Sequence, residues 1–140
     1  MITFYILNKN SPVSFQEHTC NIIEQEYNNG YKIHVHLATQ QEAQNMDDLL
    51  WTFKQISFIP HAIYIENSTD FLPQVTIGYN TLFSKNKDVL LNLTSNISDY
   101  FLNFKNIIEI IPHNEALKKL ARLRYRKYLE NNNKIQVINV

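Results

Sequence analysis

The sequence predicts a single three-layer α/β/α domain around a mixed, mainly parallel β-sheet, a Rossmann-like architecture. Short apolar runs alternate with amphipathic helical segments over residues 3–50, and such alternation indicates parallel strands joined by right-handed crossovers. The chain of 140 residues contains no repeat, no low-complexity linker and no break in composition. We therefore expect one domain over residues 1–140.

The first half of the chain is predicted to run strand, helix, strand, helix. Residues 3–7 form an aromatic and β-branched run that stops at turn formers, as buried strands do. Residues 14–29 open with Ser-x-x-Glu, a capping-box pattern, and continue with apolar residues at helical spacing. Residues 33–37 alternate apolar and polar positions like a strand, and Thr39 can cap a helix that runs through Leu50.

The second half is less regular, and its elements are predicted from apolar runs and helix starts. Ser98 is expected to cap a short helix, and Pro112 is expected to end a strand. His61 and His113 each follow a proline and are expected at turns or helix entries. The predicted strands are residues 75–78, 89–93, 107–111 and 135–138. The predicted helices are residues 99–104 and 114–130.

The composition limits the function classes. Lys and Arg together number 13, as do Asp and Glu. The protein therefore has no overall positive charge that would attract duplex DNA, and we expect that its function does not require direct DNA binding. The single cysteine, Cys20, has no partner for a disulfide and fits a reducing compartment. The N-terminal residues lack a signal-peptide pattern, and no apolar run approaches the roughly 20 residues that span a membrane. We expect a cytoplasmic protein without membrane contact.

The motifs that would indicate an enzyme are weak. The loop of residues 8–13 contains none of the glycines with which nucleotide-binding folds approach phosphate groups. His34 and His36 point to one face of a predicted strand, and we expect partly exposed polar positions because no carboxylate or cysteine lies at ligand spacing. His18 and Cys20 are two residues apart on a predicted helix and do not face each other, so the sequence does not support a Cys–His nucleophile pair there. We therefore expect no catalytic residues, no metal and no cofactor.

The predicted helix of residues 114–130 has two different faces at about 100° per residue. Its expected packing stripe consists of Leu117, Leu120, Ala121 and Tyr128. The neighbouring face gathers a tyrosine among cations, namely Lys118, Arg122, Tyr125 and Arg126. Arg124 points toward the packing stripe, so we expect a structural role in which its guanidinium is paired or reaches back to solvent.

The cationic face admits two interpretations. A run of charges is commonly an ordinary solvated surface. Tyr125, however, can wall a small apolar socket while the surrounding cations neutralise a carboxylate, which is the chemistry needed to hold the acidic, aromatic end of a peptide. Trp51 is the only tryptophan; it stands near the end of a predicted helix and can serve either in the core or as an interface anchor.

Four segments carry a family resemblance. They are Leu-Trp-Thr-Phe at residues 50–53, Ser-Phe-Ile-Pro-His at 57–61, Phe-Lys-Asn-Ile-Ile-Glu-Ile-Ile-Pro at 104–112, and residues 117–128, which include Leu-Ala-Arg-Leu-Arg-Tyr. In this combination and order they resemble the chi subunit of bacterial DNA polymerase III. The resemblance covers most of the chain, whereas residues 64–95 match poorly.

The resemblance implies a noncatalytic α/β subunit that acts as an adaptor in DNA replication. Such a subunit binds the psi subunit, which tethers it to the clamp loader, and it binds the acidic C-terminal tail of single-stranded DNA-binding protein. The tail-binding positions that the resemblance implies are Lys118, Arg122, Tyr125, Arg126 and Trp51. Phe58 corresponds to a residue that contacts psi, or a helicase that competes for the same surface, although the sequence equally permits a core position for Phe58.

Two other functions remain open from the sequence. One is an α/β enzyme that uses a nucleotide or a metal, which a thermal shift with either ligand would indicate. The other is direct binding of single-stranded nucleic acid through the basic, aromatic face of residues 114–130. A gel shift with DNA alone would separate this function from that of a protein adaptor.

Overall fold

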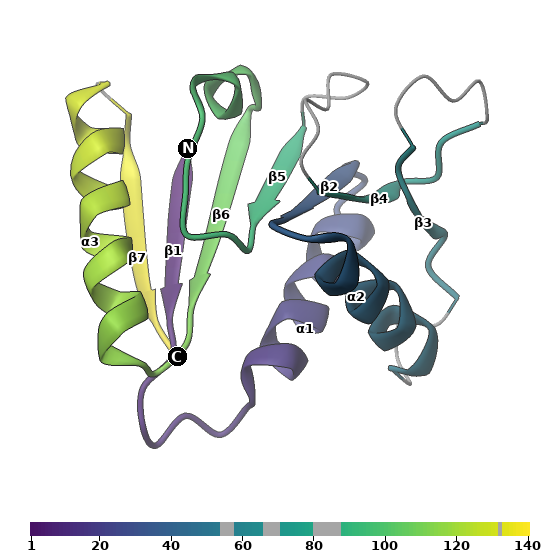
Figure 1. The fold of residues 1–140 in the computed structure, drawn as a ribbon, viewed down its shortest axis with the longest axis horizontal. Coiled ribbons are helices and arrows are strands. Elements are labelled where there is room, and N and C mark those ends of the chain that lie inside the picture. The colour runs from purple at the N-terminus through teal and green to yellow at the C-terminus, as the bar shows by residue number, and fades with distance from the viewer. Residues whose placement is uncertain (54–57, 66–70, 80–87, 132) are drawn as a thin grey trace.

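The computed structural model describes residues 1–53, 58–65, 71–79, 88–131 and 133–140. Within these ranges the chain forms one sheet of seven parallel strands in the order β3-β4-β2-β5-β6-β1-β7 (Figure 1). The strands are β1 (Ile2–Ile6), β2 (Ile33–Leu37), β3 (His61–Ile63), β4 (Val75–Tyr79), β5 (Val89–Asn92), β6 (Asn106–Ile111) and β7 (Ile135–Asn139). The helices are α1 (Phe15–Asn28), α2 (Gln40–Thr52), the 3₁₀ helix η1 (Asp99–Asn103) and α3 (Glu115–Glu130).

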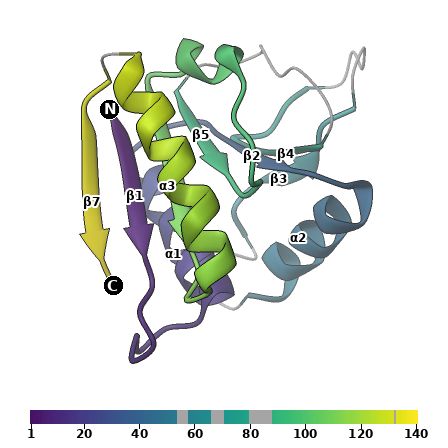
Figure 2. The ribbon, with the colours of Figure 1, turned by 60° about the vertical axis from the view of Figure 1, so that its left-hand side comes forward.

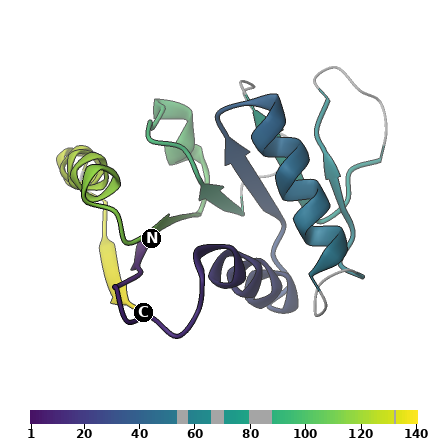
Figure 3. The same ribbon diagram turned by 60° about the horizontal axis from the view of Figure 1, so that its bottom comes forward.

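Helices cover both faces of this sheet, which confirms the predicted three-layer α/β/α fold; the described strands are all parallel rather than mixed. The larger apolar cluster joins α1 and α2 to one face, with residues such as Ile23, Leu50 and Val35. A second cluster joins η1 and α3 to the opposite face through Phe101 and Tyr128. Figure 3 shows α1 and α3 on opposite sides of the sheet.

Side-chain caps fix the starts of the three α-helices where the sequence predicts them. Ser14, Thr39 and Asn114 each accept a hydrogen bond from the backbone N–H three residues further on, at 3.0–3.1 Å. The predicted cap at Ser98 is wrong in one respect, because its side chain makes no capping hydrogen bond and the short helix that follows is η1. Short 3₁₀ segments of this kind are frequent connectors between longer elements.

The strand β3 was missing from the sequence-based prediction, which placed His61 at a turn. His61 begins β3, which pairs only with β4 among the described strands. The backbone N–H of Val75 donates to the carbonyl of Pro60 at 3.2 Å, so the proline immediately precedes a ladder. A strand of three residues carries too little alternation to be recognised from its sequence.

The strand order separates the two ends of the molecule. The helix α3 and the strand β7 lie together at one edge of the sheet, whereas α2 packs against β2, β3 and β4 toward the other edge (Figure 2). Residues on α2 and on α3 therefore belong to different surfaces. No helix in the described ranges has the length and apolar character needed to cross a membrane.

Candidate functional site

A buried polar network fixes α3 on the sheet. Glu109 of β6 is 0% exposed, and its carboxylate accepts hydrogen bonds from Arg124 Nε at 3.1 Å and from the Tyr128 hydroxyl at 2.8 Å, both on α3. Asn92 of β5 donates a third, from Nδ2 at 2.9 Å. Burial raises the pKa of Glu109, and the charge of Arg124 acts in the opposite direction. The predicted structural role of Arg124 is confirmed.

This network sets the rotation of α3. Ala121, Arg124 and Tyr128 are buried against the sheet. Leu117 and Leu120 were predicted to lie in the packing stripe, but both are partly exposed. Leu120 lies about 40° from Arg124 around the helix, on the solvent side of the buried stripe. Leu117 shares the angular position of Arg124 and Tyr128, but it stands in the first turn of α3, at the end of the contact with the sheet. The cationic side of α3 is thereby held at the flank, next to the strands.

A cavity of about 300 Å³ lies between α3 and the neighbouring strands β1 and β7. Ile6 of β1 and Val137 of β7 line it on the sheet side. Lys118, Arg122 and Tyr125 line it on the helix side. Its other lining residues are Phe4, Asn8, Ile111, Ala121 and Asn139. We call this site the α3–β7 cavity; it lies at the edge of the sheet where Figures 1 and 3 show α3 next to β7.

The α3–β7 cavity combines a fixed apolar wall with cations. Tyr125 is half-buried, and its ring packs edge to face on Phe4 with the ring centroids 5.7 Å apart. Lys118 is partly buried, with Nζ 3.3 Å from Nδ1 of His113, and Arg122 is exposed. No acidic side chain is among the described residues that line the cavity. This arrangement suits an apolar or aromatic group that carries a carboxylate.

The structure brings three of the five predicted tail-binding residues together. Lys118, Arg122 and Tyr125 line the α3–β7 cavity, whereas Arg126 is exposed on the same helix and does not line it. Trp51 lies near the end of α2, toward the opposite edge of the sheet from β7. Its assignment to the same pocket is therefore not supported by its position, because α2 packs against β3 and β4 and not beside β7.

The residues on the sheet side of the α3–β7 cavity, which form its floor, were not predicted from the sequence. Phe4 and Ile6 come from β1, and Val137 comes from β7, so these residues are far from α3 along the chain. Their alternation predicted strands but not which helix lies above them. Only the strand order, in which β7 is added next to β1, brings them beneath α3.

Trp51 belongs to a second exposed surface, near the end of α2 and the starts of β3 and β4. Trp51 is 59% exposed, and its ring centroid lies 4.5 Å from that of His61. Phe58, which precedes β3, is 95% exposed, so the core position considered for it is excluded. Phe71, which precedes β4, is 94% exposed. Because β3 and β4 are parallel and paired, both strands start at the same end of the sheet. We call Trp51 and Phe58, which lie near the start of β3, the aromatic surface.

Of the two histidines of β2, His36 is partly exposed as predicted, but His34 is not. His34 is fully buried rather than partly exposed, because β2 lies between β4 and β5 and both of its faces are covered. Its Nδ1 lies 2.7 Å from the Thr76 hydroxyl oxygen, and burial lowers its pKa to about 3. Cys20 is also buried, which raises the pKa of its thiol to about 12. Within the described ranges, no three His, Cys, Asp or Glu side chains form a group that could hold a metal ion.

Comparison with known proteins agrees with these features. Residues 1–136 match the family described as DNA polymerase III chi subunit, HolC. The DNA polymerase III subunit chi of Haemophilus influenzae is 31% identical over 127 residues, which cover 89% of this chain and 86% of that protein. Its counterpart in Pseudomonas aeruginosa is 26% identical over 129 residues, with 92% and 89% covered. That of Escherichia coli is 25% identical over 130 residues, with 90% and 88% covered. The chain therefore belongs to the DNA polymerase III chi subunit family.

Proposed function

We propose that this chain is a noncatalytic subunit of DNA polymerase III that links the clamp loader to single-stranded DNA-binding protein during DNA replication. The psi subunit is its partner on the clamp-loader side, and the acidic C-terminal tail of single-stranded DNA-binding protein is its partner on the other side. The observation that carries the proposal is the α3–β7 cavity, an apolar socket with cations at its rim.

The chemistry of the cavity supports a defined arrangement of the tail. Arg122 donates hydrogen bonds to the terminal carboxylate, and the last aromatic ring enters the socket beside Tyr125. Lys118, at the rim near the start of α3, adds positive potential around the terminal carboxylate. Burial of one ring contributes about 1.5–3 kcal/mol, and a hydrogen bond to a charged group contributes about 1.5–3 kcal/mol. After the costs of association, the affinity for a single tail is expected to be on the order of micromolar.

Replacing Arg122 with alanine is expected to weaken tail binding by about 10- to 150-fold, because one charge-assisted hydrogen bond is lost. The measurement is a fluorescence titration with an acidic peptide that ends in Asp-Ile-Pro-Phe. A peptide without the final Phe is expected to bind wild type with a comparable loss. Binding of the full peptide should also weaken as salt is added, since the cations at the rim are accessible to counterions.

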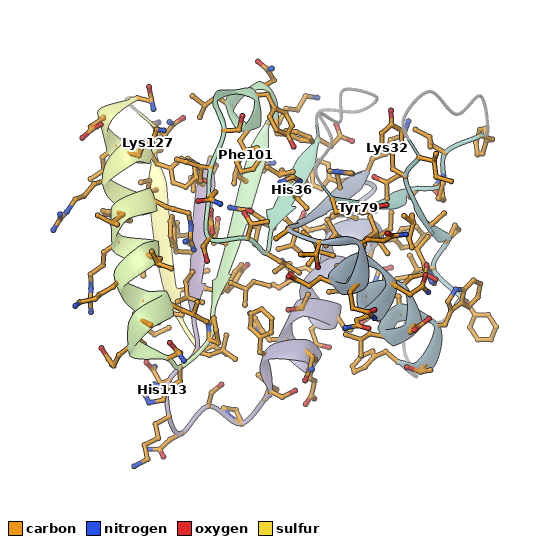
Figure 4. The ribbon with its side chains drawn as sticks, viewed as in Figure 1. Lys32, His36, Tyr79, Phe101, His113 and Lys127 are labelled. Atoms are coloured by element: carbon orange, nitrogen blue, oxygen red, sulfur yellow. The ribbon has the colours of Figure 1, made fainter. Side chains whose placement is uncertain are left out.

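The matched control is Lys127→Ala, which removes one cation from the same helix. Lys127 is exposed and does not line the cavity; Figure 4 labels it near the opposite end of α3 from His113. This variant is expected to bind the peptide like wild type. Equal affinity of wild type and Arg122→Ala would contradict the proposal. Gel retardation of single-stranded DNA in the absence of any peptide or partner would favour direct nucleic-acid binding instead.

Phe58 is expected to anchor the psi subunit. Replacing Phe58 with alanine should weaken psi binding by about 30-fold or more, which is the effect of removing an aromatic residue at the centre of an interface. The exposure of its side chain means that folding is expected to be unchanged. Isothermal titration with purified psi measures the affinity, and circular dichroism checks the fold. A helicase that uses the same surface is expected to compete with psi in this assay.

The two binding sites provide reciprocal controls. The aromatic surface and the α3–β7 cavity lie toward opposite edges of the sheet, so each variant is expected to lose one partner and to keep the other. Phe58→Ala should retain the affinity for the tail peptide, and Arg122→Ala should retain the affinity for psi. Loss of both partners in either variant would indicate a general defect and would count against two separate sites.

A further inference from the structure

The strand β7 leaves one side of the sheet open. It pairs with β1 on one side, and no other described strand pairs with it. Val137, at its centre, is exposed. The edge of a sheet presents unpaired N–H and C=O groups that can receive a further strand. In this chain the open edge runs directly beside the α3–β7 cavity, because Val137 and Asn139 belong to both.

The register of β7 identifies which of its backbone groups are open. Ile2 N–H donates to the carbonyl of Lys134 at 3.0 Å, and Val140 N–H donates to the carbonyl of Ile6 at 2.9 Å. In a parallel ladder, successive residues direct their backbone groups alternately to the two sides of the strand. Gln136 and Ile138 therefore face β1. The residues that direct N–H and C=O toward the open edge are Ile135, Val137 and Asn139.

We propose that an acidic peptide bound in the α3–β7 cavity continues along this edge as an eighth strand of the sheet, parallel to β7. This inference rests on the proposed function, because the peptide is the tail whose terminal ring and carboxylate occupy the cavity. Main-chain hydrogen bonds to Ile135 and Val137 hold the residues that precede the terminus. Strand addition of this kind provides affinity through the backbone, while the cavity provides selectivity for the end group.

The position of the cavity determines the direction of the added strand. The cavity adjoins Val137 and Asn139, in the second half of β7. With the chain terminus held there, the preceding residues can follow only the first half of the strand, toward Ile135. The peptide therefore runs in the same direction as β7.

Charge on α3 supports the same direction. The helix runs back across the sheet from the end of β6 to the start of β7, so Arg126 lies further toward the start of β7 than Arg122 does (Figure 2). Arg126 is exposed outside the cavity, at the level where the acidic residues before the terminus pass. The parallel strand thus gives Arg126 a partner that the cavity alone does not provide.

Hydrogen exchange tests the inference residue by residue. In the free protein, the amides of Ile135 and Val137 are expected to exchange rapidly, whereas those of Gln136 and Ile138 are protected by β1. Saturation with the peptide ending in Asp-Ile-Pro-Phe, extended by its preceding acidic residues, is expected to slow exchange at Ile135 and Val137 by about tenfold or more. The amides of Gln136 and Ile138 serve as internal controls and should change little.

Backbone methylation of the peptide gives an independent measurement without any change to the protein. Two peptides carry N-methyl groups on alternate residues among those that precede the proline, in opposite phases, since the proline itself has no N–H to remove. Only one phase directs its N–H groups at β7, so only one peptide is expected to lose affinity. Equal affinities of the two methylated peptides and the unmodified one would overturn the inference.

The outcomes separate this inference from the proposed function. A peptide that binds in the fluorescence titration but leaves the amides of Ile135 and Val137 unprotected would overturn the added strand alone. A peptide that does not bind at all would overturn the proposed function. Protection of these two amides in the free protein that increases with protein concentration would show a second copy of this chain on the edge, and would also overturn the inference.

Discussion

Replacing Arg124 with alanine is expected to lower the free energy of unfolding by about 3–5 kcal/mol, the usual cost of removing one partner from a buried ion pair. Glu109 is 0% exposed, and without Arg124 only the Asn92 amide and the Tyr128 hydroxyl would be left as described donors to its carboxylate. The loss would also remove the hydrogen bond from Arg124 to the carbonyl of Ser95, at 3.3 Å. Urea denaturation followed by circular dichroism gives the change directly.

The chain offers a closely matched control for this variant. Arg126 lies on the same helix, two residues further on, but is exposed, so Arg126→Ala is expected to change stability by less than about 0.5 kcal/mol. Combining Glu109→Gln with Arg124→Met removes both charges together and should restore part of the lost stability, because no uncompensated charge is left buried. Equal and small losses in Arg124→Ala and Arg126→Ala would show that the pair does not hold α3 on the sheet.

The position of Arg124 could be predicted because helical periodicity is a local property. Its angular position among Ala121 and Tyr128 placed the guanidinium on the buried side without knowledge of any other element. Its partner could not be predicted in the same way. Glu109 lies in an apolar strand on the far side of a turn, and a carboxylate in such a strand becomes interpretable only when α3 is packed on it.

The candidate site also has one part that the sequence predicts and one part that it does not. The cationic wall of the α3–β7 cavity follows from the spacing of Lys118, Arg122 and Tyr125 on one helix. The apolar floor depends on the strand order. The same order places Trp51, which the family resemblance adds to the site, toward the opposite edge of the sheet. A sequence pattern determines which residues share a face of one element, but it does not determine which elements become neighbours across a sheet.

The histidine at position 34 shows a further limit. Alternation in residues 33–37 assigned the two faces of the strand correctly, and a solvated face was expected for the polar positions. In a parallel sheet with helices on both sides, a central strand has no solvated face. His34 is therefore buried beside Thr76, with Tyr64 in edge-to-face contact at a centroid distance of 6.4 Å.

Burial of His34 makes the stability of the protein depend on pH. Burial lowers the pKa of His34 to about 3, and the nearby His36 acts in the same direction, whereas an unfolded chain binds the proton near pH 6.5. Because the pKa is lower in the folded state, the stabilisation is fully present above about pH 6.5 and is lost as the pH falls from there toward 3. The contribution of this one group amounts to about 1.4 kcal/mol for each pH unit in that window.

Replacing His34 with glutamine is expected to remove this slope, although the variant should be less stable than wild type at pH 7. The test compares the free energy of unfolding of both proteins in urea at pH 7, 6, 5 and 4, and the difference between them should shrink steadily as the pH falls. His113→Gln is the control, since His113 is exposed at the start of α3 (Figure 4) and its loss should leave the slope unchanged. A constant difference between wild type and His34→Gln across this range would mean that the buried ring does not couple protonation to unfolding, and that the acid sensitivity of the protein comes from other groups.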